Sequence, residues 1–117
     1  MRSHWEDYRG KRIFIGCYEH LTLDEYRAEA AEAEKEMLKQ PPNSVLLLVL
    51  TEGLIMSPQA LSLTKGLAKR TQPRVHKTAI LGITGARRAL LDIVVKFSGM
   101  QVVPFDDVQK AKEWLVS

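Results

Sequence analysis

The 117-residue sequence predicts a single α/β domain: a mainly parallel sheet of four or five strands with four helices. Apolar runs typical of strands alternate with stretches whose apolar residues recur every three or four positions, as in amphipathic helices. The run Val45–Leu50 is apolar without alternation, which favours a parallel strand buried on both faces. The length is below the roughly 150 residues of a typical domain, so one domain over residues 1–117 is predicted.

The first strand-and-helix unit is predicted from residue 12 onward. Residues 12–18 form its strand, and residues 4–10 can add a short antiparallel edge strand. Thr22 and Glu25 have the spacing of a capping box, which begins a helix. That helix ends before Pro41, because a proline restricts the residue that precedes it. It has an apolar stripe (Leu23, Tyr26, Ala30, Ala33, Met37) and an acidic outer face (Glu25, Glu29, Glu32, Glu36).

The second unit has its strand at residues 45–51 and its helix from Ser57 to about Arg70. Serine caps open amides, and Pro58 suits the first helical position. Met56 and Leu61 are spaced for a hydrophobic staple around this start.

Two further units complete the chain. The third has a strand at residues 78–83 and a helix at residues 86–97, which Gly99 ends in left-handed geometry. Its expected inner face is Ala86, Leu90, Ile93, Val94 and Phe97. The fourth has a strand at residues 101–105 and a helix capped by Asp106, whose expected buried stripe is Val108, Ala111, Trp114 and Leu115.

Composition excludes several classes of function. A single cysteine, Cys17, excludes an internal disulfide, a CxxC redox site and a cysteine-rich zinc site. The three histidines have no metal-ligand spacing, so no metal site and no cofactor is predicted. No secretory leader is visible and no apolar run is long enough to cross a membrane, which predicts a soluble cytoplasmic domain.

Charge is unevenly distributed along the chain. Residues 19–36 carry seven acidic and two basic side chains, net −5, whereas residues 65–96 carry eight basic and one acidic, net +7. Such segregation favours docking to an acidic partner, an anionic surface or a second copy of the chain; two ordinary solvated helix faces are the simpler alternative. Because aromatic residues are not interleaved with the basic ones, nucleic-acid binding is not expected.

The carboxyl ends of the strands are the expected place for a site, because ligands of open α/β sheets bind there. Thr51, Glu52 and Gly53 follow one strand, and Thr84, Gly85, Arg87 and Arg88 follow the next. Arginines with open amides at a helix start can bind phosphate or carboxylate, although solvated or internally paired arginines are the simpler interpretation. Glu52 alone, or Cys17 with His20, does not complete a catalytic constellation, so no enzyme is predicted.

Four stretches carry a family resemblance: YRGKRIFIGCY, VLLLVLTEGLIMSPQAL, KTAILGITGARRALLDIVVKFSG and VVPFDDVQKAKEWL. With them the chain resembles the STAS-like family, in particular its SpoIIAA-like branch, which is related to bacterial anti-sigma-factor antagonists. The resemblance extends from Tyr8 to Leu115 and includes no catalytic signature. It implies helices mainly on one face of the sheet, and a non-enzymatic role in protein interaction or regulation.

The resemblance also suggests where partners bind. In the antagonists a serine of a DS[ST]G motif is phosphorylated, and Ser57 stands at that place without the motif's aspartate and glycine. The implied partner surface is the loop of residues 52–57 together with Lys65 and Lys69. The SpoIIAA-like branch is similar to CRAL-TRIO lipid-binding domains as well. A small anionic or lipid-like ligand at Thr51–Gly53 and Thr84–Arg88 is therefore the alternative function.

Overall fold

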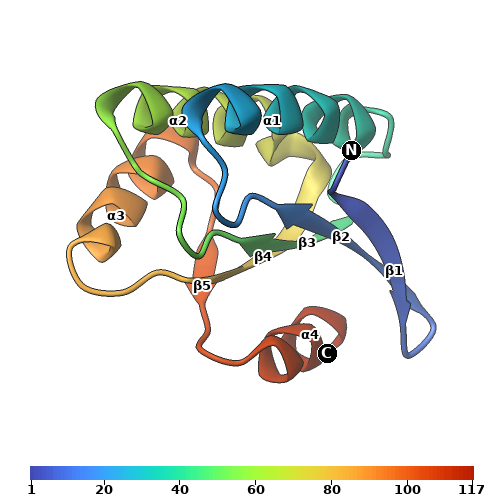
Figure 1. Ribbon diagram of the computed structural model, residues 1–117. Coiled ribbons are helices and arrows are strands. Elements are labelled where there is room, and N and C mark those ends of the chain that lie inside the picture. The colour runs from blue at the N-terminus through green and yellow to red at the C-terminus, as the bar shows by residue number, and fades with distance from the viewer.

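The computed structural model describes all residues, 1–117, and has two layers of helices around one sheet (Figure 1). The five strands are β1 (His4–Tyr8), β2 (Lys11–Cys17), β3 (Val45–Leu50), β4 (Val75–Leu81) and β5 (Val102–Pro104). The four α-helices are α1 (Leu23–Leu38), α2 (Pro58–Thr71), α3 (Arg87–Ser98) and α4 (Val108–Val116), and a 3-10 turn, η1 (Gln72–Arg74), follows α2. No helix is long and apolar enough to cross a membrane.

The strands lie in the sheet in the order of the sequence, β1-β2-β3-β4-β5. β1 pairs antiparallel with β2, and the pairings β2–β3, β3–β4 and β4–β5 are parallel. The α/β class and the antiparallel N-terminal edge strand were therefore predicted correctly. The sheet itself is mixed, where the sequence predicted a mainly parallel one, because the β1–β2 hairpin adds the antiparallel edge.

Strand order determines the layers. Each parallel crossover connects a strand to its next neighbour in the sheet, always in the same direction. Because such crossovers are right-handed, their helices all lie on the same face of the sheet. Helices α1, α2 and α3 consequently lie on one face, while α4 alone covers the opposite face (Figure 1). There α4 packs against β2, β3 and β4.

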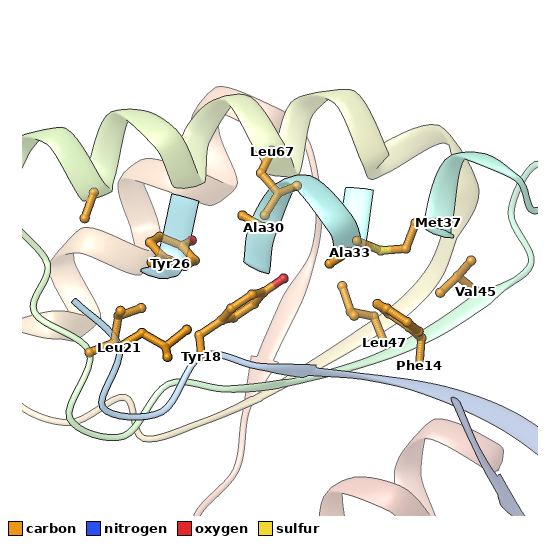
Figure 2. Close-up of a cluster of buried hydrophobic side chains, with 12 residues drawn as sticks. Phe14, Tyr18, Leu21, Tyr26, Ala30, Ala33, Met37, Val45, Leu47 and Leu67 are labelled. Atoms are coloured by element: carbon orange, nitrogen blue, oxygen red, sulfur yellow. The ribbon is translucent and has the colours of Figure 1, made fainter. Parts of the chain in front are cut away.

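Each face of the sheet has its own core. The larger core lies under α1 and α2 and includes Phe14, Tyr18, Met37 and Leu47 (Figure 2). The smaller core joins Ile13 and Leu48 of the sheet to Ala111 and Leu115 of α4. The alternation along β2 and β3 explains this division, because neighbouring residues of a strand point to opposite faces.

Local signals for the helix ends were mostly correct. Thr22 and Glu25 form the predicted capping box of α1. Ser57 caps α2 by accepting a hydrogen bond from the Ala60 amide, and Gly99 ends α3 with φ of +75°. The cap of α4 was misassigned: Asp107, not Asp106, accepts from the amides of Gln109 and Lys110.

Four further expectations were wrong. Strand β4 begins three residues before Thr78, because a strand can carry exposed polar residues such as His76. Ile93 and Phe97 of α3 are 42% and 46% exposed, so the predicted inner face of that helix is only partly buried. Glu29 is buried, not part of a solvated acidic face. Ala86, the N-cap of α3, and Val108 are exposed as well.

Candidate functional site

An apolar cavity of about 100 Å³ lies between the sheet and helices α2 and α3. Its floor is formed by β3, β4 and β5, and its roof by α2 and α3. Tyr18, Tyr26 and Met37 close one side; Figure 2 shows Tyr18 between the sheet and the helices. Of its 22 lining residues 17 are hydrophobic, and the cavity is partly open to solvent. The site therefore has the apolar lining of a small-molecule pocket.

The cavity arises from the way α3 packs. Helix α3 has extensive contacts with α2 but few with the strands, and it lies away from the sheet in Figure 1. Only Val94 of its twelve residues is buried, while Leu90 and Leu91 are half-buried and line the cavity.

Four threonines line this cavity, and three of them bond to the protein. Thr51 donates to the Leu81 carbonyl at 2.7 Å, and Thr71 donates to the Leu67 carbonyl at 2.8 Å. Thr64 donates to a carbonyl of its own helix at 2.8 Å and lies 2.6 Å from the Tyr26 hydroxyl. These hydroxyls are consequently satisfied, as buried hydroxyls usually are.

Thr78 is the exception among the four. It is 2% exposed, and its Oγ1 has no hydrogen-bond partner. Thr78 lies opposite Leu47 and Val102 in the sheet, and all three residues line the cavity. A buried hydroxyl without a partner is unfavourable by about 1–3 kcal/mol.

The two tyrosines at the side of the cavity remain neutral. Burial raises the pKa of Tyr18 far above its usual range, with smaller contributions from Tyr26 and Glu29. Burial also raises the pKa of Tyr26, and its hydrogen bond with Thr64 opposes that effect. The two rings meet edge to face at 5.0 Å. This wall of the cavity therefore contributes aromatic surface without charge.

Arg87 is the one charged side chain that lines the cavity. Its Nη1 donates to the Gly82 carbonyl at 2.8 Å and its Nη2 to the Thr51 carbonyl at 3.2 Å. These bonds fasten α3 to the ends of β4 and β3. Two of the five guanidinium N–H groups are used in this way, which leaves three for other acceptors.

The start of α3 does not offer the open amides that the sequence suggested. The amides of Arg87, Arg88 and Ala89 each donate to the carbonyl three residues earlier, at 3.1–3.2 Å. Ala86 at the N-cap has no side-chain capping bond. Because the first amides of α3 already have acceptors, this helix end does not present the free backbone N–H groups that bind anions at other helix N-termini.

The predicted site residues separate into two places. Thr51 and Arg87 line the apolar cavity. Glu52, Thr84 and Arg88 line a different, more polar groove of about 730 Å³ beside the N-terminal end of α4. The predicted residues at the carboxyl edge of the sheet therefore border two different surfaces. Gly53, Ser57, Lys65, Lys69 and Gly85 line neither of them.

Lys65 and Lys69 instead lie over an exposed aromatic ring. Their Nζ atoms are 4.6 and 4.8 Å from the centre of the Phe97 ring. Phe97 with these two lysines forms a basic and aromatic patch across α2 and α3. Ser57 is half-buried at the start of α2, where its hydroxyl acts as a cap. Whether it accepts phosphate stays a prediction.

No family model, no curated protein and no solved structure matches the chain. The STAS-like resemblance therefore remains an expectation from the sequence stretches that carry it. The structure adds a residue that sequence reasoning missed, Thr78. A threonine within an apolar strand was the available signal.

Proposed function

We propose that this domain binds a small, largely apolar molecule in the cavity between α2, α3 and the sheet. The observation that supports this proposal is the cavity itself, which is apolar, partly open and unfilled by the surrounding side chains. Protein interiors are otherwise close-packed. An apolar cavity of roughly 150 Å³ accepts a benzene-sized molecule. This cavity has about 100 Å³ and is partly open, so it holds a short chain, while a single ring would extend into its opening.

The expected affinity is modest. Burying six ring carbons at about 0.8 kcal/mol each contributes about 5 kcal/mol, before the entropic cost of association. Without that cost the value corresponds to a Kd near 0.2 mM, and the cost of association raises the Kd above it. A lipid-like ligand fits this lining better than an anionic one, because 17 of the 22 lining residues are hydrophobic and Arg87 is already bonded to two carbonyls.

Thermal unfolding in the presence of toluene tests the proposal. At ten times Kd, binding adds about 1.4 kcal/mol of stability, which raises the Tm by about 5 °C in a domain of this size. Ala68→Leu places a larger side chain in the cavity, since Ala68 is buried and lines it. We expect this variant to lose the shift, whereas Ala31→Leu, on the exposed face of α1, keeps it.

Two results would contradict the proposal that the cavity binds a ligand. If toluene and longer alkyl probes leave the Tm of the wild-type protein unchanged, the cavity is not a binding site. If Ala68→Leu responds as strongly as Ala31→Leu, the probes bind elsewhere.

A second candidate function is a STAS-like protein-interaction domain without catalysis. Ile55 supports it, because this large apolar residue is 78% exposed in the loop before α2. Its neighbours Leu54 and Met56 both line the cavity. A partner seated on Ile55 would therefore contact the same loop that a ligand contacts from inside.

Co-purification from an extract of the source organism tests this second candidate. We expect Ile55→Asp to lose a partner that the wild-type protein retains, and Ile93→Asp, an exposed apolar residue of α3, to keep it. Retention of the partner by Ile55→Asp, or no partner at all, would remove this candidate.

A further inference from the structure

We propose that the basic and aromatic patch of Lys65, Lys69 and Phe97 docks the protein on an anionic lipid bilayer. Docking of this kind goes beyond the cavity ligand and does not depend on it. Phe97 is 46% exposed, and the Nζ atoms of Lys65 and Lys69 lie 4.6 and 4.8 Å from the centre of its ring. Two helices that pack on each other, α2 and α3, thus hold two cations beside one exposed ring.

The apolar part of this surface extends along α3. Ile93 is 42% exposed and lies four residues before Phe97, so the two side chains are neighbours on one face of the helix. Single apolar residues are ordinary on a protein surface, whereas adjacent ones with a polar rim mark a site of contact with a protein or a membrane. Amphipathic helices insert side chains of this kind among lipid headgroups.

The cations around Ile93 and Phe97 have no carboxylate partner within the protein. None of Lys65, Lys69 and Lys96 forms an ion pair, and Lys96 lies three residues after Ile93 on α3. Each lysine near an anionic bilayer strengthens binding about fivefold. The charge of this surface therefore complements that of an anionic membrane.

The shape of the surface favours a bilayer over a protein partner. None of the three larger cavities is lined by a residue of the patch or by Ile93, so no pocket receives a partner's side chain there. Protein interfaces obtain most of their binding energy in such pockets. A second copy is disfavoured because its exposed carboxylates on α1 are already used: Asp24 pairs with Arg27 and Glu32 with Lys35.

Co-sedimentation with lipid vesicles tests the docking surface. We expect the wild-type protein to bind vesicles of equimolar phosphatidylcholine and phosphatidylserine, and not vesicles of phosphatidylcholine alone. High salt should release it, because salt screens exposed charges. Replacing Lys65 and Lys69 together by alanine should weaken binding about thirtyfold. Replacing Lys35 and Lys39 by alanine removes the same charge from two exposed, paired lysines and should leave binding nearly unchanged.

Phe97→Ala tests the apolar part of the surface. Close to half of Phe97 is exposed and available for transfer into the bilayer interface, so its loss should weaken binding about fivefold. Leu38→Ala is the control, since Leu38 is 40% exposed at the end of α1 and should not contribute. Urea unfolding shows that each variant is folded, and the lysine variants decide the question if Phe97→Ala is not.

Several results would overturn the proposed docking. The wild-type protein would not bind the anionic vesicles, or the two double lysine variants would lose binding equally. Tighter binding to free polyglutamate than to the vesicles would assign the surface to an acidic protein. A dimer in sedimentation equilibrium that is lost without Lys65 and Lys69 would assign it to a second copy. None of these results bears on the cavity, which the Tm shift with toluene tests separately.

Discussion

Replacing Glu29 by glutamine is expected to lower the free energy of unfolding by about 2 kcal/mol. Glu29 lies on α1, is 8% exposed, and holds the chain start through two backbone bonds. The Arg2 amide donates to its Oε1 at 3.0 Å and the Ser3 amide to its Oε2 at 2.7 Å. Glutamine keeps one acceptor oxygen and turns an NH₂ group toward the other amide, so one charge-assisted bond of about 1.5–3 kcal/mol is lost.

The effect should spread from α1 to the sheet. Ser3 is itself buried, and its Oγ accepts a hydrogen bond from the Cys17 amide at 3.0 Å. Urea unfolding of the wild-type protein, Glu29→Gln and Glu32→Gln measures the difference. Glu32 is exposed on the same helix, so its substitution should stay within about 0.5 kcal/mol of wild type. Equal effects of the two substitutions would refute the reasoning.

The pH dependence provides a second test of the same contact. Burial raises the pKa of Glu29, but the bonds from the Arg2 and Ser3 amides outweigh it and the pKa is lowered overall. A lowered pKa in the folded state gives stability that is present above the unfolded pKa, near 4.5, and is lost as the pH falls through the folded value. The gap between the wild-type protein and Glu29→Gln should therefore shrink on acidification below about pH 4.5.

Three smaller predictions concern the loops and helix contacts. Gly82→Ala should lower the free energy of unfolding by about 1–3 kcal/mol in urea, because Gly82 has φ of +87° and a Cβ there would lie 2.7 Å from the Glu52 nitrogen. Gly85→Ala, which has open space around it, should cost less and is its control. Ser57→Ala should cost about 1 kcal/mol by removing a cap, while Ser57→Asp should keep most of it; equal Tm values for the two would contradict this. Arg70→Lys replaces a two-bond contact with Glu34, at 2.7 and 2.9 Å, and should cost under about 1 kcal/mol because the pair is partly exposed; a larger loss measured in urea at high salt would be unexpected.

Local signals predicted much of the fold. Thr22 with Glu25 and Ser57 with Pro58 identified two helix starts, because a cap depends only on nearby backbone. The strand Val45–Leu50 was evident from its apolar run. Asp106 and Asp107 are adjacent and both suit an N-cap. The choice between them depended on the path of the chain between β5 and α4, which the sequence does not specify.

The site was harder to predict than the fold, because it depends on packing between distant segments. The positions of Ile93 and Phe97 suggested a helix fully packed on the sheet, yet α3 packs on α2 and leaves both residues exposed. That packing leaves the cavity between α3 and the sheet. Likewise, some acidic side chains of residues 19–36 make contacts within the protein. Glu34 forms an ion pair with Arg70, one of the basic residues of 65–96, and Glu29 accepts a hydrogen bond from the Arg2 amide.

Filling the cavity separates its effect on stability from its effect on binding. Ala68→Leu adds apolar volume at a position that lines the cavity, so we expect it to raise the Tm without ligand and to abolish the Tm shift caused by toluene. The gain in stability alone would show only that the space can be filled. The loss of the shift, with Ala31→Leu still responding, assigns the toluene site to this cavity. If Ala68→Leu folds and keeps the full shift, the probe binds elsewhere and the cavity has no part in binding.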